Sequence, residues 1–201
     1  MNKTIKGIAA PLPLTNVDTD VIMPKRFLIT ITREGLADGT FADLRFESSG
    51  QIQPDFVLNK AAWTQANILI VGDNFGCGSS REHAVWGMRQ LGIDACIGTG
   101  FAGIFYDNAR KNGLALPIVS TDTRDRLLQF ANNSNGAEVT IDLAARKITT
   151  GEISASFEMD DATQTALIRG RDDTLDSLEY ADAIHAFEAN LDDKMRVSVR
   201  K

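Results

Sequence analysis

Short apolar runs alternate with helix-period patterns along the first two thirds of this chain of 201 residues. Residues 4–12 and 68–72 form short runs of mostly apolar residues, a pattern that predicts strands, the second of them buried. From Ala84 to Leu91 apolar residues recur at helical spacing, and Gly92 follows where a C′ glycine ends a helix. The same alternation predicts strands over 93–98 and 114–119 and helices over 101–113 and 121–131. It is typical of an α/β fold with parallel neighbouring strands.

The pattern changes after residue 136. Segments 138–142 and 153–157 alternate apolar and polar positions, which predicts half-exposed antiparallel strands with a turn over 144–147. Two acidic helical segments follow, over 160–169 and 180–191. The packing stripe of the second is expected from Ile184, Phe187 and Leu191.

Local signals add detail to this outline. Ser120 is placed to cap the helix that follows it, and residues 60–66 have a helical pattern. The irregular stretch of about 28–53 is typical of a binding loop or lid. The face of the 101–113 helix is expected from Phe101, Ile104, Phe105 and Ala109. We expect one α/β domain over 1–201, with a mixed sheet flanked by helices.

The composition is that of an ordinary folded protein, with 43% hydrophobic and 24% charged residues. A net charge of −6 argues against a nucleic-acid partner, because binding a phosphate backbone requires a basic face. We expect no membrane partner, since no apolar run reaches about 18 residues, and the first residues do not fit a signal peptide. Two cysteines make no disulfide framework, so a reducing, cytoplasmic location is expected.

The central strand leads into a glycine turn that opens the next helix: residues 74–91 read NFGCGSSREHAVWGMRQL. The glycines let the backbone approach a ligand closely, and the free N–H groups of a helix start favour an anion. Arg81 adds a forked, permanently charged donor suited to a carboxylate or phosphate. The stretch therefore predicts an anion-binding corner with the hydroxyls of Ser79 and Ser80 in reach.

Other assignments of these residues stay open. Ser79 could cap the helix, and Glu82 three residues later would complete a capping box. Cys77 with His83 as its base would make a thiol nucleophile, and His83 could carry a phosphoryl group. The cysteines and histidines lack the spacing of a zinc site, and no lysine follows the glycines as in a phosphate-binding loop. The polar loop 16–20 is typical of an Asx turn or a helix cap.

Three stretches together resemble the small subunits of 3-isopropylmalate dehydratase, in the aconitase superfamily: NVDTDVIMPKRFL, NFGCGSSREHAVWGMRQLGI and GTGFAGIFYDNARKNGLALPIV. The resemblance is close over residues 5–120 and looser at ADAIHAFE, 181–188. It implies a swivelling β/β/α domain that closes over a large partner subunit, in a heterodimer or a higher assembly. It also implies a 4Fe-4S cluster bound by three cysteines. Because this chain has only Cys77 and Cys96, we expect no metal here and the cluster in the large subunit.

Carried over residue by residue, the resemblance makes Ser79 the base, which acts as an alkoxide on a carbon-bound proton. Ser80 and Arg81 match groups that hold a carboxylate of the small dicarboxylate substrate, and Arg33 is the candidate for selecting its side chain. The residues expected to support these groups are Gly78, Glu82, His83, Asp18, Thr19 and Asp20. The implied reaction removes water from 2-isopropylmalate and re-adds it to give 3-isopropylmalate, while the iron activates the leaving hydroxyl.

Two other functions compete with this one. The first keeps the chemistry and changes the substrate, to homoaconitate or to a methylated malate such as the hydrate of citraconate. The second is not enzymatic: an anion-binding regulator or a phosphohistidine carrier. A carrier requires an exposed His83, whereas the dehydratase requires an exposed Ser79.

Overall fold

The computed structural model describes residues 4–28, 35–136, 138–151, 153–170 and 177–191. The chain divides into two compact units, Met1–Gly170 and Arg171–Lys201, and the first contains every strand formed by the described residues. Arg33 lies outside the described residues.

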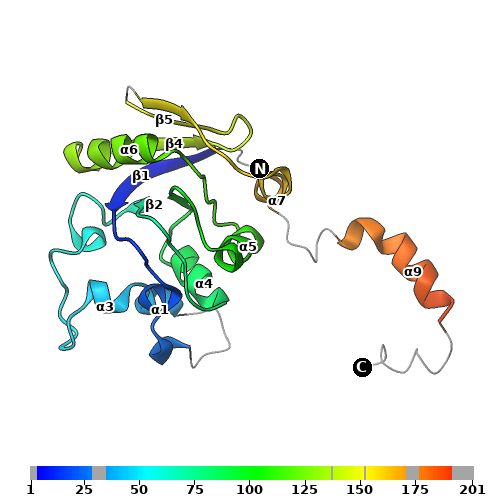
Figure 1. The fold of residues 1–201 in the computed structure, drawn as a ribbon. Coiled ribbons are helices and arrows are strands. Elements are labelled where there is room, and N and C mark those ends of the chain that lie inside the picture. Colours follow the sequence, from blue (N-terminus) through cyan, green and yellow to red (C-terminus); the bar gives the residue numbers. More distant parts are fainter. Residues whose placement is uncertain (1–3, 29–34, 137, 152, 171–176, 192–201) are drawn as a thin grey trace. The chain divides into compact units, whose positions relative to one another are not determined.

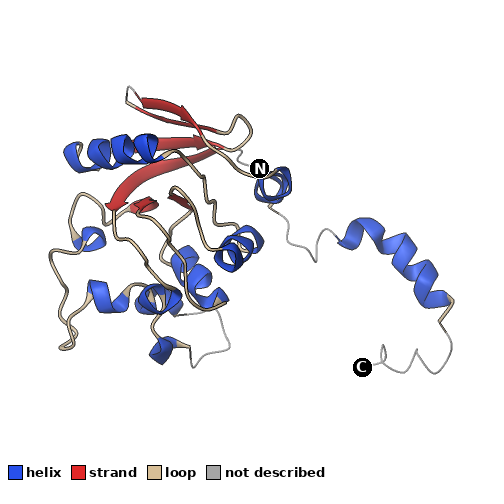
Figure 2. Ribbon diagram, viewed as in Figure 1, coloured by secondary structure: helices blue, strands red, loops and turns tan. Residues whose placement is uncertain are grey.

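One mixed sheet of six strands forms the first unit, drawn as red arrows in Figure 2. Its order is β3-β2-β1-β4-β5-β6. The strands are Thr4–Leu12 (β1), Ala66–Val71 (β2), Ala95–Ile97 (β3), Glu138–Asp142 (β4), Lys147–Thr150 (β5) and Ile153–Ser156 (β6). β2 pairs in parallel with both β1 and β3, whereas β4, β5 and β6 continue the sheet from β1 as an antiparallel meander.

Helices cover both faces of the parallel half of the sheet (Figure 1). One face carries α1 (Thr19–Ile22), α4 (Glu82–Gln90) and α5 (Gly103–Lys111), and the other carries α6 (Thr121–Asn133). The remaining short elements of this unit are η1 (Lys25–Phe27), α2 (Leu36–Gly39), α3 (Ala42–Arg45), η2 (Val57–Asn59) and α7 (Asp161–Arg169). The second unit contains η3 (Leu178–Tyr180) and α9 (Ala181–Ala189). No helix among the described residues has the length and apolarity needed to cross a membrane.

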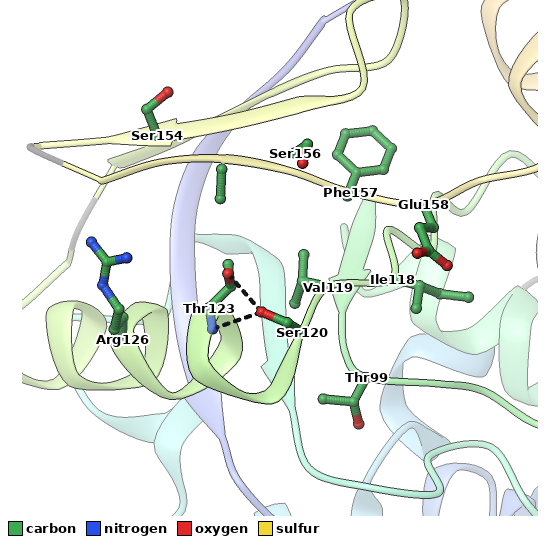
Figure 3. A pocket seen from close by; sticks show the side chains of 11 residues that line it. Thr99, Ile118, Val119, Ser120, Thr123, Arg126, Ser154, Ser156, Phe157 and Glu158 are labelled. Atoms are coloured by element: carbon green, nitrogen blue, oxygen red, sulfur yellow. Dashed lines mark hydrogen bonds between the residues drawn. The ribbon is translucent and has the colours of Figure 1, made fainter.

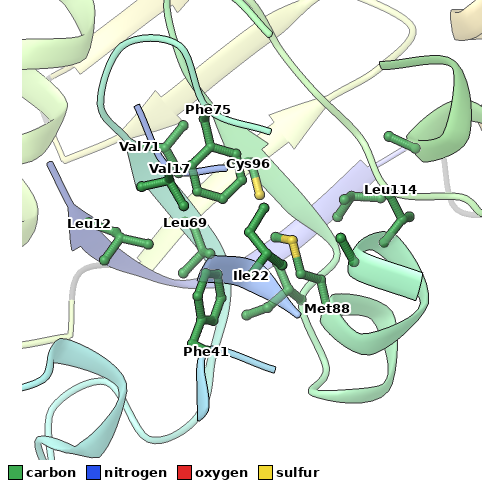
Figure 4. Packing of buried hydrophobic residues seen from close by; sticks show 14 of the residues in the cluster. Leu12, Val17, Ile22, Phe41, Leu69, Val71, Phe75, Met88, Cys96 and Leu114 are labelled. Carbon is green, nitrogen blue, oxygen red and sulfur yellow. The ribbon is translucent and has the colours of Figure 1, made fainter. Parts of the chain in front are cut away.

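The central strand β2 is buried on both faces, as its continuous apolar sequence predicts. Leu69 and Val71 pack on the α4 side, where Figure 4 shows Leu69 near Phe41 and Val71 near Phe75. Ile68 and Ile70 pack on the α6 side, and all four strand residues are fully buried. Full burial of one such side chain contributes about 1.5–3 kcal/mol. Because four of them hold β2 in the core, the position of the turn that follows the strand is fixed as well.

Most predicted elements are confirmed. The strands at 4–12 and 68–72 and the helix from Ala84 to Leu91 are present, the helix as α4, and Gly92 stands at C′ with a φ of +92°. Ser120 caps α6, because its hydroxyl accepts a hydrogen bond from the N–H of Thr123 at 3.2 Å. The antiparallel strands at 138–142 and 153–157 are confirmed as β4 and β6.

Other expectations were wrong. Residues 60–66 form successive turns instead of a helix, because Trp63 bonds back to Lys60 and Ala66 to Trp63, and Ala66 already belongs to β2. Residues 114–119 form isolated parallel bridges beside β3 rather than a strand, and Pro117 supplies no N–H there.

The remaining differences concern exposure and one missed strand. The predicted turn after β4 leads into β5, an extra strand whose Ile148 is fully buried, and only then into β6. Ile104 is exposed, so it does not belong to the packed face of α5. Ile184 and Phe187, on α9 of the second unit, are exposed, and the packed stripe expected there stays a prediction.

Candidate functional site

The predicted motif lies on the turn between β2 and α4. Gly76 and Gly78 have φ angles of +78° and +94°, a region that glycine enters without steric cost. Gly76 is constrained further, because a Cβ there would lie 2.3 Å from Cγ of Phe105. The turn leaves Ser79 and Ser80 exposed at the start of α4, where an anion-binding corner was predicted.

A second loop, formed by residues 17–20, lies alongside this turn. The N–H of Gly76 donates to the Val17 carbonyl at 2.8 Å. The N–H of Thr19 donates to the Cys77 carbonyl at 2.9 Å, and Asp18 forms a parallel bridge with Cys77. Backbone pairing thus brings together two motifs that are far apart in the sequence.

A single side-chain atom of Thr19, its hydroxyl oxygen, contacts three different atoms of Ser79. Its Oγ1 lies 3.0 Å from Ser79 Oγ, donates to the Ser79 carbonyl at 3.1 Å and accepts from the Ser79 N–H at 3.2 Å. Thr19 is only 1% exposed, whereas Ser79 is exposed. The buried hydroxyl of Thr19 therefore holds the exposed Ser79 in place.

The two aspartates that flank Thr19 have separate contacts. Asp18 caps α1 by accepting from the N–H of Val21 at 2.8 Å, which confirms the helix-cap interpretation of this loop. Asp20 forms an ion pair with Arg81, whose side chain is 18% exposed. The loop therefore holds both the serine and the arginine of the predicted site.

The start of α4 differs from the predicted capping box. Arg81 is the N-cap residue and no side chain caps the helix, in contrast to α6 and α7, which Ser120 and Asp160 cap. Glu82 instead accepts a hydrogen bond from the Asn112 amide at 2.7 Å. The first turn of α4 thus keeps uncapped N–H groups and the positive end of the helix dipole next to the exposed serines.

Asn112 was missed by sequence reasoning. Its carbonyl oxygen accepts from Nε1 of Trp86 at 2.9 Å while its amide nitrogen donates to Glu82, so it ties the start of α4 to the end of α5. An asparagine before a helix-ending glycine reads as an ordinary helix terminus, so the sequence carried no signal for this role.

His83, Cys77 and Cys96 have surroundings that do not point to a thiol nucleophile or a metal site. The ring of His83 packs against the ring of Trp86, with the two centroids 4.8 Å apart. Cys77 is half-buried, and Cys96 is fully buried, which raises the pKa of its thiol. Among the described residues no three His, Cys, Asp or Glu side chains gather to hold a metal ion.

The turn is also held from the α6 side, by a contact that the sequence did not predict. Asp73 accepts from the Thr99 hydroxyl and from Nη1 of Arg124, both at 2.6 Å, and these hydrogen bonds hold the pKa of Asp73 below its usual value. Arg124 is only 9% exposed. The first residue of the turn is therefore anchored by a nearly buried guanidinium.

A cavity of about 630 Å³ lies elsewhere, between β6 and the start of α6 (Figure 3). Figure 3 shows the hydroxyls of Ser120, Thr123 and Ser156 around it. It contains none of the predicted site residues. The chemistry of the 74–91 motif and this hollow are separate features of the molecule.

Comparison with known protein families supports the resemblance. A family model for the aconitase C-terminal domain matches residues 1–123, and one described as LeuD_N matches residues 125–161. The 3-isopropylmalate dehydratase small subunit of Ruegeria sp. (strain TM1040) is 47% identical over 187 residues, 92% of this chain and 93% of that protein. The chain belongs to this family of 3-isopropylmalate dehydratase small subunits.

Further relatives agree with the assignment to the 3-isopropylmalate dehydratase small subunits. The small subunit of Sinorhizobium fredii (strain NBRC 101917 / NGR234) is 49% identical over 191 residues, 94% of this chain and 95% of that protein. A crystal structure of 3-isopropylmalate dehydratase from Methanocaldococcus jannaschii DSM2661 has a TM-score of 0.66 at 29% identity and covers 92% of this chain and 99% of that chain. The predicted aconitase-type fold of this small subunit is therefore confirmed.

Proposed function

We propose that this chain is the small subunit of a hydro-lyase that isomerises 2-isopropylmalate to 3-isopropylmalate in leucine biosynthesis, active together with a large subunit. The observation that carries the proposal is the exposure of Ser79 and Ser80 at the uncapped start of α4, beside Arg81. These groups form an open half-site on the surface of the chain. A half-site of this kind suits a pocket that a partner subunit completes.

Ser79 is the proposed base. As an alkoxide it takes the carbon-bound proton: the C–H bond breaks, an O–H bond forms on Oγ, and the electron pair becomes the new C=C bond as the hydroxyl leaves. A serine hydroxyl is a very weak acid, so its anion needs strong stabilisation. The positive end of α4 and the guanidinium of Arg81 supply positive potential at this position. Departure of the hydroxyl is left to the large subunit.

Ser80 and Arg81 are the proposed partners of a substrate carboxylate. Arg81 already pairs with Asp20 through Nη1. A guanidinium has five N–H donors, so this pairing leaves donors for a second carboxylate. Asp20 thus orients Arg81 without exhausting its hydrogen-bonding capacity.

The residues of this chain do not fit a 4Fe-4S cluster. Such a cluster in this superfamily takes three cysteines, and the chain has Cys77 and Cys96, of which Cys96 is sealed between the sheet and its helices. We therefore assign the cluster to the large subunit and derive no step through it here. The two free thiols suit a reducing cytoplasm, which is the location we propose.

The competing functions receive no specific support. His83 is only partly exposed and packs on Trp86, which does not favour a phosphohistidine carrier. The residue expected to select the substrate side chain, Arg33, lies outside the described residues, so its role stays a prediction.

Anaerobic reconstitution tests the proposal. The chain is combined with an iron-loaded large subunit of the same family and offered 2-isopropylmalate, homocitrate and a methylated malate in parallel. We expect turnover of 2-isopropylmalate through the unsaturated intermediate. Preferred turnover of another hydroxy diacid would reassign the substrate, and a well-formed complex inactive on all of them would overturn the proposal.

A further inference from the structure

The hydrogen bonds between Thr19 and Ser79 point to a specific role for Thr19. Every side-chain hydrogen bond of Thr19 described above ends on Ser79: on its hydroxyl, its carbonyl and its N–H. We propose that Thr19 is a positioning residue that switches its single proton between the Ser79 carbonyl and the Ser79 alkoxide. This inference rests on the proposed function, because it assigns Ser79 the part of the base.

Counting protons shows why the contact has two states. A threonine hydroxyl has one proton to donate and two lone pairs to accept with. With Ser79 protonated, Thr19 donates to the Ser79 carbonyl and accepts from both the Ser79 N–H and the Ser79 hydroxyl, which uses all three capacities. With Ser79 ionised, its Oγ can only accept, so the Thr19 proton rotates from the carbonyl to Oγ at 3.0 Å. The O–H bond of Thr19 stays intact throughout.

The consequence is a selective stabilisation of the anion. A hydrogen bond to an ionised oxygen is roughly twice as strong as a neutral one. Thr19 therefore gains more from the alkoxide than from the hydroxyl, which lowers the pKa of Ser79. Because Thr19 is 1% exposed, it is already in place before any charge develops and water does not compete for its proton.

Two other buried threonines of this chain, Thr40 and Thr150, behave differently. Thr40 donates to the Leu36 carbonyl at 2.9 Å and Thr150 to the Glu138 carbonyl at 2.6 Å, and both lie well inside the fold. Those bonds join a hydroxyl to the backbone alone, as a purely structural threonine does. Thr19 is distinguished by its contact with the hydroxyl that the proposed function makes reactive.

Replacing the Thr19 hydroxyl by a methyl group tests the inference. In the reconstituted complex we compare Thr19→Val with Thr19→Ser, which keeps the hydroxyl, and with Thr150→Val as a control that removes a structural buried hydroxyl. Thr19→Val should lower kcat by about 100-fold with KM changed less than about threefold. It should also move the acidic limb of the pH profile of kcat to higher pH, because the Ser79 anion is less stable. Thr19→Ser should restore most of kcat and the profile.

The charged and titratable groups around Ser79 are unchanged in these variants, so a moved pH limb reports on the hydroxyl. They are Asp18 and Asp20 on the α1 side and Cys77, Arg81, Glu82 and His83 on the turn and α4. A Thr19→Val complex with the kcat and pH profile of the wild type, or a Thr19→Ser complex as impaired as Thr19→Val, would overturn the inference.

A second measurement does not depend on turnover. The Ser79 amide donates to Thr19 Oγ1, so Thr19→Val in the chain alone should speed its hydrogen exchange by about tenfold or more, read by NMR. Unchanged exchange would overturn the contact even if the complex were inactive. If instead the wild-type complex converts no hydroxy diacid, the proposed function is wrong, and the exchange measurement still tests the contact between Thr19 and Ser79. If Thr19→Val does not fold, Thr19→Ala replaces it in both measurements.

Discussion

Arg81 and Asp20 form an ion pair that joins the start of α4 to the start of α1 across 61 positions of sequence. The Arg81 side chain is mostly buried by this arrangement, whereas that of Asp20 remains 44% exposed. A pair this accessible contributes at most about 1 kcal/mol to stability. Its greater effect is on the direction in which the guanidinium points.

Asp20→Asn should therefore affect substrate binding more than folding. We expect KM for 2-isopropylmalate to rise by about threefold to tenfold with kcat little changed, because Arg81 loses its orientation. Steady-state kinetics of the reconstituted complex measure this. Asp43→Asn is a matched control, since Asp43 pairs with Arg26 on the surface. A lower KM in Asp20→Asn would show that Asp20 competes with the substrate instead of orienting Arg81.

The glycine turn can be tested by separating backbone strain from steric clash. Gly76→Ala should destabilise the fold by about 2–4 kcal/mol, because φ is +78° and the new Cβ meets the Phe105 ring. Gly113→Ala has a similar φ of +70° and open space around its Cβ, so it should cost only about 1 kcal/mol. Urea unfolding of both variants gives the difference. Equal losses would mean that the Phe105 contact adds nothing.

The strand–turn–helix unit was predictable because its signals are local. The run 68–72 is short and rich in branched apolar residues, which indicated a buried strand, and the spacing from Ala84 to Leu91 indicated the helix. The contact of Thr19 with Ser79 was not predictable, since nothing in one sequence shows which loop pairs with the turn. The resemblance placed Thr19 near the site, and the structure shows which atoms of Thr19 and Ser79 are in contact.

The errors have equally specific causes. The capping box failed because Asn112, from a later helix, takes Glu82 as its acceptor. The strand expected over 114–119 failed because Pro117 interrupts the hydrogen-bond ladder. The sequence analysis made no prediction for Arg124, and only the fold shows that it reaches back to Asp73.

Asn112→Ala should weaken the link between α4 and α5. It removes the acceptor of the Trp86 indole N–H bond and the donor to Glu82, so we expect a loss of about 1–3 kcal/mol in the free energy of unfolding. Asn132→Ala, at an exposed position of α6, is the control and should change stability by less than about 0.5 kcal/mol. A loss in Asn112→Ala no greater than in this control would contradict the link.

Asp73 gives the fold a pH dependence with a defined sign. Its pKa is lower in the folded chain than in the unfolded chain, owing to the hydrogen bonds from Thr99 and Arg124. It therefore stabilises the fold above the ordinary carboxyl pKa of about 4, and this contribution is lost as the pH falls through the lower folded value. Asp73→Asn should lower the Tm at pH 7, and the difference from wild type should shrink below about pH 4. A difference that is constant from pH 7 to pH 3 would contradict this account.

The most direct test of the half-site is the turnover of 2-isopropylmalate by a complex that contains Ser79→Ala. Ser154→Ala, which changes an exposed serine on β6, serves as the control. We expect that Ser79→Ala still binds the large subunit but loses about 1,000-fold or more in kcat, while Ser154→Ala retains wild-type activity. An assembled Ser79→Ala complex that turns over 2-isopropylmalate at near the wild-type rate would contradict it.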